Sequence, residues 1–259
     1  MTKEYPRFVL PISQPFDPVE LIQQTEKIVC SGNKRKYTNF YATGVYGGIA
    51  TGYTVGCCLR CIFCWVSLSR EYPERYGKLH SPEEVFNKLS YIARKRRTAK
   101  LRISGAEPTL GKEHLLELLA LMEASTFDLF ILETNGIYFG IDEHYARDVS
   151  RFNKVHTRVS LKAGTPEDFT RKTGATPEAF ELPFQGMRNL IKHKAGFHVA
   201  AMSADSRIMT STERRKLLNK LYGIHPTLVK NLEEEVVDPY KTSLIRLVKA
   251  GYSLRWNRN

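Results

Sequence analysis

Short apolar runs alternate with amphipathic stretches along most of the chain. Runs rich in β-branched and aromatic residues predict strands, whereas apolar residues three and four positions apart predict helices. Ser81 is typical of a helix N-cap, because Pro82 follows it and Glu84 completes a capping box. The expected strands cover residues 50–56, 101–104, 129–133, 155–161, 197–202 and 232–237. The expected helices cover residues 81–97, 112–123, 142–152, 176–192, 212–222 and 241–249.

Strands that alternate with helices are typical of a parallel sheet built from βα units. The order predicts roughly six such units, whereas a closed (β/α)₈ barrel typically needs about 250 residues. We therefore expect an α/β fold, a partial (β/α)₆ barrel with a short N-terminal extension. In this interpretation residues 1–50 form a loose extension, residues 51–240 form the core domain, and residues 241–259 form a C-terminal helix and tail.

Composition is compatible with a folded core and gives no sign of a membrane. The chain has 259 residues, of which 42% are hydrophobic, so it can bury a core without disulfides. No stretch approaches the roughly 20 uninterrupted apolar residues that span a bilayer. The first residues carry charges and prolines where a signal peptide would need an apolar run. We therefore expect a cytoplasmic protein without membrane contact.

A basic charge balance makes nucleic acid a candidate partner. The chain has 39 Lys and Arg against 27 Asp and Glu, a formal charge of +12. Such an excess attracts polyanions, although a solvated Lys/Arg surface explains it equally well. The basic runs lie at 34–36, 94–97 and 214–216, and the first lies near Tyr37, Phe40 and Tyr41, which could stack on bases.

The five cysteines are unevenly distributed, and four of them fall within eight residues. Such clustering indicates a metal or redox site rather than a disulfide framework. Cys57, Cys61 and Cys64 on one tight loop can bind three irons of a cubane Fe–S cluster, which leaves the fourth iron open to a small molecule. A closed zinc site needs four ligands, and no second CxxC pair occurs outside this loop. Cys30 and Cys58 are more typical of ordinary buried cysteines.

The spacing CxxxCxxC, with Phe63 just before the last cysteine, resembles the signature loop of the radical S-adenosylmethionine (SAM) superfamily. The resemblance covers about residues 51–240 and implies that Cys57, Cys61 and Cys64 hold a [4Fe–4S] cluster whose open iron binds SAM. It further implies an electron donor such as a ferredoxin or flavodoxin. One electron then cleaves SAM to methionine and a 5′-deoxyadenosyl radical, which abstracts hydrogen from the substrate. The backbone of Phe63 is expected beside the adenine.

The segment after the second expected strand, Ser104 to Thr109, resembles the family's Gly-Gly-Glu-Pro element. In the family this element binds the amino group of SAM, so the resemblance implies contacts from Gly105, Ala106 and Glu107. Ala106 stands where the second glycine usually occurs. The sequence leaves open whether Glu107 reaches the ligand or braces the turn.

Two later strands add further expected SAM contacts. Ser160 and Lys162 resemble the place where the family presents a lysine to the carboxylate of SAM, and Arg158 shares their face as a second choice. Val199 and Ala201 on the next strand are expected to line the adenine pocket, unless they are ordinary core residues.

The substrate has competing interpretations. The Glu133-Thr134-Asn135-Gly136 segment, the compact length and the single cluster resemble glycyl-radical (pyruvate formate-lyase) activating enzymes, oxidoreductases that take hydrogen from a backbone glycine. Glu133 replaces the family's cation-binding Asp, and Ser160 stands at the position of the matching acid, so the sequence leaves a monovalent cation site open. The basic charge and the Phe-Cys-Trp ending of the loop resemble RNA-modifying radical SAM enzymes that build wybutosine in tRNA. A small-molecule substrate and a non-catalytic Fe–S or zinc protein stay open.

Overall fold

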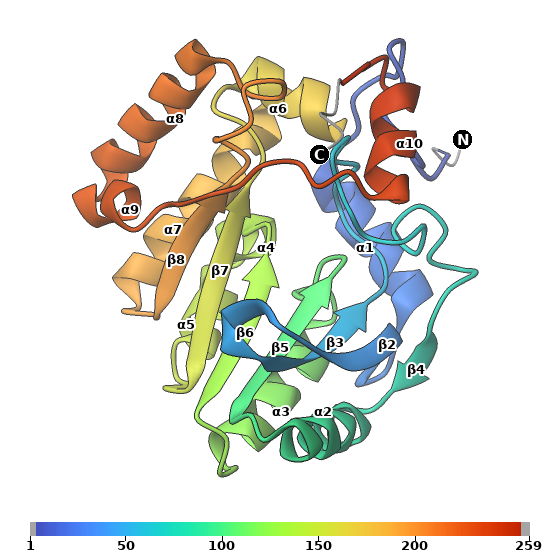
Figure 1. Cartoon of the computed structure of the whole chain (residues 1–259), viewed down its shortest axis with the longest axis vertical. Coiled ribbons are helices and arrows are strands. Elements are labelled where there is room, and N and C mark those ends of the chain that lie inside the picture. The colour runs from blue at the N-terminus through green and yellow to red at the C-terminus, as the bar shows by residue number, and fades with distance from the viewer. Residues whose placement is uncertain (1–3, 255–259) are drawn as a thin grey trace.

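A nine-stranded sheet carries the functional elements, and most of its strands are parallel (Figure 1). The computed structural model describes residues 4–254. The parallel strands are β3 (Ile49–Thr54), β5 (Lys100–Gly105), β6 (Leu129–Thr134), β7 (Val155–Leu161), β8 (Phe197–Ala201) and β9 (Glu233–Glu234). The antiparallel strands are β1 (Cys30–Ser31), β2 (Lys34–Thr43) and β4 (Lys78–His80). The strand order β1-β2-β3-β5-β6-β7-β8-β9 describes an open sheet, so the predicted partial barrel is confirmed as a fold class.

Helices cover one face of the sheet and the ends of its strands. They are α1 (Pro18–Val29), α2 (Pro82–Arg96), α3 (Lys112–Glu123), α4 (Ile137–Ile141), α5 (Glu143–Val149), α6 (Pro166–Thr173), α7 (Leu182–Lys192), α8 (Ser211–Ile224), α9 (Pro226–Lys230) and α10 (Lys241–Lys249). In Figure 1, α4, α5 and α7 lie behind the sheet, while α6 and α10 lie at the upper ends of the strands. No helix within residues 4–254 is both long and apolar enough to cross a bilayer.

Several elements begin and end where their local signals predict. The Ser81 hydroxyl accepts from the Glu84 backbone N–H at 3.3 Å, and the Glu84 carboxylate accepts from the Ser81 N–H at 2.9 Å, which completes the predicted capping box. The bounds of α3, α10 and β7 coincide with the predicted ranges. Strong periodicity with clear ends was sufficient for these elements.

One predicted helix is shorter in the structure, and another is divided. The segment 142–152 contains α5, which begins where the Asp142 carboxylate accepts from the Tyr145 N–H at 3.1 Å and ends at Val149. The segment 176–192 is a 3₁₀ turn (Pro177–Glu181) followed by α7, since Pro183 occupies the first turn of α7 and donates no backbone hydrogen bond. The predicted strand 232–237 is reduced to the two residues of β9.

The expected loose N-terminal extension contains regular structure instead. Asp17 caps α1 by accepting from the Val19 N–H at 2.8 Å, and β2 pairs with β3 in antiparallel register, for example Ala42 with Ala50. These elements do not follow the βα repeat, so the repeat gave no reason to expect them. The three-part division of the chain stays a prediction.

Helices α4 and α7 approach each other closely behind β6 and β7. A Cβ added at Gly186 would lie 2.4 Å from the carbonyl oxygen of Gly136, and one added at Gly140 would lie 2.0 Å from that of Leu182. Only glycine permits this distance, because any side chain would overlap the neighbouring backbone. The contact fixes the turn at Asn135 and Gly136, which faces the cysteine loop.

Gly186→Ala should therefore lower the free energy of unfolding by about 2 kcal/mol, since backbone atoms must move apart. The matched control is Gly223→Ala in α8, where a Cβ meets nothing within 4 Å. We expect the control to be neutral or slightly stabilising, because alanine favours helix more than glycine does. Urea unfolding of both variants checks this, and equal stability of the two would contradict the close-packing argument.

Candidate functional site

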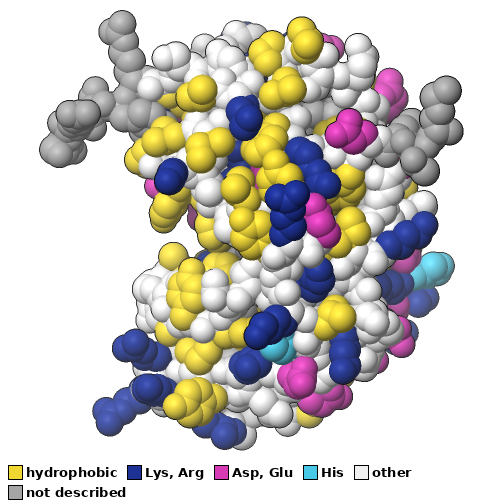
Figure 2. Space-filling view, turned by 90° about the vertical axis from the view of Figure 1, so that its right-hand side faces the viewer, with side chains coloured by type: hydrophobic (Ala, Val, Ile, Leu, Met, Phe, Trp, Pro, Cys, Tyr) yellow, Lys and Arg dark blue, Asp and Glu magenta, His cyan; other side chains and the backbone are white. Residues whose placement is uncertain are grey.

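A cavity opens at the C-terminal ends of the parallel strands, where barrel folds place their chemistry. The cysteine loop forms one wall, and the ends of β5, β6 and β7 form the wall opposite. In Figure 2 the surface is hollowed along its left-hand edge, the side that faces the viewer in Figure 1. The predicted site residues that line this cavity are Cys57, Cys61, Phe63, Cys64, Gly105, Ala106, Glu107, Ser160 and Lys162.

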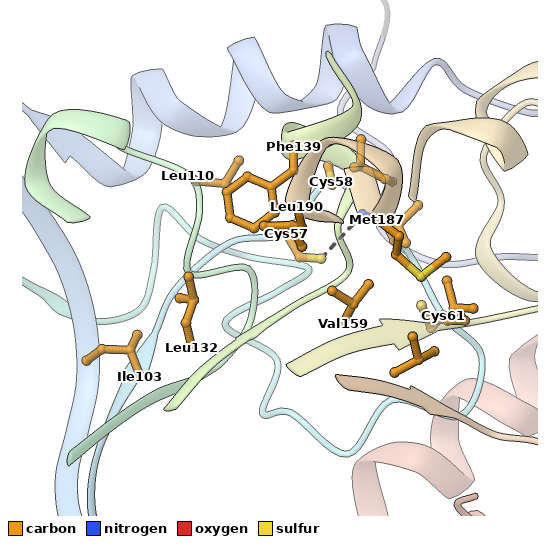
Figure 3. Close-up of a cluster of buried hydrophobic side chains, with 14 of the residues drawn as sticks. Cys57, Cys58, Cys61, Ile103, Leu110, Leu132, Phe139, Val159, Met187 and Leu190 are labelled. Atoms are coloured by element: carbon orange, nitrogen blue, oxygen red, sulfur yellow. Dashed lines mark hydrogen bonds between the residues drawn. The ribbon is translucent and has the colours of Figure 1, made fainter. Parts of the chain in front are cut away.

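Three of the five cysteines line the cavity, and the other two do not. Cys58 is directed into the buried cluster that includes Phe139 and Met187 (Figure 3), and its sulfur accepts from the Asn135 amide at 3.2 Å. Cys30 lies in β1, outside the loop, and burial raises the pKa of its thiol. The fold thus separates the three candidate ligands from the two cysteines that the sequence left over.

The candidate ligands differ in how readily they lose a proton. Burial raises the pKa of Cys61 to about 12, although the positive charge of Lys162 opposes this. A hydrogen bond from Cys58 holds the pKa of Cys57 lower, at about 7. Because thiolate is the form that binds metal, loading iron into this loop must release protons.

Each of the three cysteines is held by a different buried arginine. The side chains of Arg60, Arg70 and Arg246 are at most 2% exposed. The bonds run from Arg60 Nη1 to Cys57 O (2.8 Å), from Arg70 Nη1 to Cys61 O (2.8 Å) and from Arg246 Nη1 to Cys64 O (2.5 Å). The backbone of the loop is therefore fixed by three guanidinium groups, and Arg70 is also among the residues that line the cavity.

Positive charge is in excess around this loop. Arg70 and Arg246 share one carboxylate, that of Glu71, and Arg246 Nε lies 2.7 Å from it. Arg60 donates to the carbonyl groups of Pro6, Cys57 and Leu59, and its Nη2 has no hydrogen-bond partner in the described part of the chain. Buried charge needs a counter-charge nearby. A group held by three thiolates supplies it, so the loop fits an iron–sulfur cluster.

Glu107 is buried and fully engaged by donors of the protein. Its carboxylate accepts from the Thr109 N–H (3.1 Å) and hydroxyl (2.7 Å), from the Thr134 hydroxyl (2.6 Å) and from the Asn135 N–H (2.9 Å). It therefore braces the turn after β5 against the turn after β6. Gly105 precedes it at φ +98°, a conformation that favours glycine. The two turns form the far wall of the cavity together.

At the cavity end of β7, Lys162 has no carboxylate among its hydrogen-bond partners within residues 4–254. Lys162 Nζ donates to the Ser160 hydroxyl at 2.5 Å. Arg158, the second choice for a carboxylate contact, lies 2.9 Å from Glu233 and 2.7 Å from Glu235. Lys162 is thus the better placed of the two to bind an added carboxylate.

Val199, which the sequence placed at the adenine, is not among the residues that line this cavity. Strand side chains alternate between two faces, and Met202 of the same segment lines the cavity. His198 shares the face of Met202 and bonds to Glu233 at 2.9 Å. Val199 and Ala201 consequently point toward the helices, and both belong to the buried core. The sequence alone did not reveal which alternate residues of β8 face the cavity.

Glu133 is already neutralised by neighbouring side chains. Arg102 lies 3.0 Å from its carboxylate, and the hydroxyl groups of Ser104 and Tyr46 donate to it at 2.5 and 3.0 Å. Glu133 also lines the cavity, so at this wall its negative charge is paired with Arg102.

The basic runs are less available than their sequence indicates. Arg35 is fully buried and donates to the carbonyl of Leu110 at 2.8 Å, and Tyr37 is buried against His114. Arg214 is paired with Glu234 at 2.5 Å. The run at 94–97 ends α2 and is exposed. Residues 34–36 therefore do not form a continuous RNA-binding surface, because Arg35 and the neighbouring Tyr37 are buried.

Sequence reasoning missed the arginines that donate hydrogen bonds to the carbonyl groups of the loop. Arg60 carried a faint signal, because a charged residue stood within an otherwise apolar turn. Arg70 and Glu71 are adjacent and resemble an ordinary surface pair. Arg246 lies far along the chain in a helix whose partner only the fold identifies.

Glu107→Gln should lower the free energy of unfolding by about 2 kcal/mol, because the amide cannot accept all of these bonds and loses the charge that strengthens them. Glu113→Gln is the matched control, since Glu113 is exposed in the first turn of α3. Chemical denaturation of both apoproteins measures the difference. A control that loses as much stability as Glu107→Gln would refute the bracing role.

Comparison with solved structures shows the same fold. Native anSMEcpe with bound AdoMet is 20% identical, with a TM-score of 0.52 over 75% of this chain and 55% of that chain. SuiB from Streptococcus suis is 15% identical, with a TM-score of 0.50 over 72% of this chain and 39% of that chain. The chain thus spans about half the length of these proteins or less.

No curated protein matches the chain. The family model described as the radical SAM superfamily matches residues 52–202, which is more than half of the chain and includes the cysteine loop and the strands that face it. The chain therefore belongs to the radical SAM superfamily.

Proposed function

We propose that the chain is a radical SAM enzyme with a single [4Fe–4S] cluster on Cys57, Cys61 and Cys64. Family membership implies an iron–sulfur cluster, SAM and an electron donor. The observation that carries the cluster assignment is that these three cysteines line one cavity, whereas Cys58 and Cys30 do not. The cluster and SAM together supply a 5′-deoxyadenosyl radical when both are bound. A ferredoxin or flavodoxin is the proposed electron donor.

The residues opposite the loop bind and orient SAM in this proposal. Lys162 pairs with the carboxylate of SAM, and Ser160 holds the Lys162 ammonium in position. The backbone turn at Gly105 and Ala106 offers carbonyl acceptors to the amino group. Glu107 acts indirectly by bracing this turn. Phe63 packs beside the adenine at the cysteine side.

SAM cleavage tests this function directly. Anaerobically reconstituted protein reduced with dithionite should form 5′-deoxyadenosine from SAM, because three thiolates hold the cluster with one iron open. Cys61→Ala should reduce formation to the level without protein, while Cys30→Ala should retain it, since Cys30 lies outside the cavity. Liquid chromatography with mass detection measures the product. A wild type that loads iron but forms none would favour a non-catalytic Fe–S protein.

The substrate proposed for this site is a peptide segment of another protein, as in activating enzymes that act on a backbone glycine. A groove leads away from the cavity and shares Trp65, Val66 and Gly105 with it. Its lining residues are uncharged, and those that can bond a peptide backbone include Asn39 and Ser67. Nucleic acid binding depends on cations that contact phosphate, so this groove fits RNA less well.

Aromatic rings mark the entrance of the groove. Tyr41 stacks on Tyr53 with ring centroids 4.6 Å apart, and Tyr53 contacts Trp65 edge to face at 6.0 Å. Trp65 is 42% exposed and also lies near Tyr240. Such rings supply apolar contact area at a low cost in conformational entropy. They suit a chain segment that must reach the cavity from outside.

Deuterium transfer separates the substrate classes. Protein extract from cells grown on deuterated glycine should deliver deuterium into 5′-deoxyadenosine, because the radical takes the hydrogen from a backbone glycine. RNA from cells grown on deuterated nucleosides serves as the comparison, with both fractions freed of the other polymer. Mass spectrometry of the nucleoside gives the result. Deuterium that arrives only from RNA would replace the peptide proposal with the RNA-modifying alternative.

A further inference from the structure

Three arginines donate hydrogen bonds to the backbone of the cysteine loop. Arg60 lies within the loop, Arg70 lies in the turn that follows it, and Arg246 lies in α10. Arg246 also donates to the carbonyl groups of Val66 and Ser67 at 2.6 and 3.1 Å. Guanidinium groups from the loop itself, from the turn after it and from α10 therefore converge on one short backbone segment.

The charges of this cluster of side chains do not cancel. Three guanidinium groups are buried beside one carboxylate, so the group carries a net charge of +2 when all four residues are ionised. Arg70 Nε donates to the Glu71 carboxylate at 3.1 Å, and Arg70 lines the same cavity as the three candidate ligands.

We infer that Arg70 and Arg246, together with Arg60, form a cationic shell that raises the reduction potential of the cluster held by Cys57, Cys61 and Cys64. This inference rests on the proposed function, because it requires the cluster. The arginines are positioning residues, since they contact the backbone of the ligands. Glu71 moderates the shell by cancelling one of its three charges.

The physical basis is the cost of adding an electron to a buried site. Reduction takes one electron from a donor such as dithionite or a flavodoxin and makes the cluster more negative by one charge. A nearby buried cation stabilises that charge strongly, because the interior screens poorly. Net charge and hydrogen bonding around the sulfurs are known determinants of Fe–S potentials. Two excess positive charges should therefore favour the reduced form.

α10 belongs to the cluster site in this account. Besides Arg246, Thr242 of this helix donates to the carbonyl of Trp65 at 2.7 Å. The helix therefore holds the loop at the residues that follow Cys64. Cys64 is the least buried of the three candidate ligands. A change in α10 should reach the cluster through these bonds, although the helix lies outside the residues matched to the family.

The sign of the change distinguishes charge from bracing. Arg70→Gln and Arg246→Gln each remove one positive charge and should shift the midpoint potential to more negative values. Glu71→Gln removes a negative charge and should shift it to more positive values. Arg70→Lys keeps the charge while altering the contacts, so its potential should stay near that of the wild type. Arg35→Gln is the matched control, because Arg35 is equally buried but donates to the carbonyls of Leu110 and Glu107.

The experiment is an EPR-monitored redox titration of the full chain, reconstituted anaerobically and measured without SAM, with iron content determined for each variant. Opposite shifts for the Arg→Gln and Glu71→Gln variants, with no shift for Arg35→Gln, are the expected result. Unchanged potentials, or shifts in one direction for all, would overturn the inference. If Arg70→Gln or Arg246→Gln binds no cluster, the test uses Glu71→Gln and Arg70→Lys. A positive shift for Glu71→Gln with a wild-type potential for Arg70→Lys supports the inference, and any other result overturns it. A wild type that binds no cluster contradicts the proposed function instead.

Discussion

The bonds between three buried guanidinium groups and the backbone of the cysteine loop are the constraint on which the site depends. The loop directs Cys57, Cys61 and Cys64 into one cavity, and its carbonyl groups accept hydrogen bonds from Arg60, Arg70 and Arg246. A buried carbonyl without a donor costs about 1–3 kcal/mol. Segments near both ends of the chain therefore converge on the loop, since Arg60 also binds the carbonyl of Pro6 and Arg246 comes from α10.

The wall opposite the cysteine loop is polar because the two faces of the parallel sheet carry different side chains. Apolar residues such as Val159 and Val199 face the helices, and polar residues such as Arg158 and Ser160 face inward. A parallel sheet covered on both sides usually has apolar faces. The inward polar face is stable here because its charges are paired, as Arg158 is with Glu233. Polar groups can thus converge at the ends of the strands without leaving unpaired charge behind them.

Local patterns predicted much of the fold and the cysteine loop of the site, but not the arginines that bind that loop. The capping box at Ser81 and the bounds of β7 depend on neighbouring residues, so the sequence sufficed. The cysteine spacing likewise identified the loop that the fold places at the cavity. Which residues of β8 face the cavity depends on how the strand pairs with β7, and this pairing places Val199 beside Val159. Arg246 was beyond prediction because its contact joins residues about 180 positions apart.

The central claim is that three cysteines hold a cluster whose fourth iron is open to SAM. EPR spectroscopy of the reduced, reconstituted protein before and after addition of SAM tests it most directly. SAM should change the signal of a [4Fe–4S] cluster in the wild type, because a small molecule binds the open iron. A cluster signal that is identical with and without saturating SAM would contradict the account.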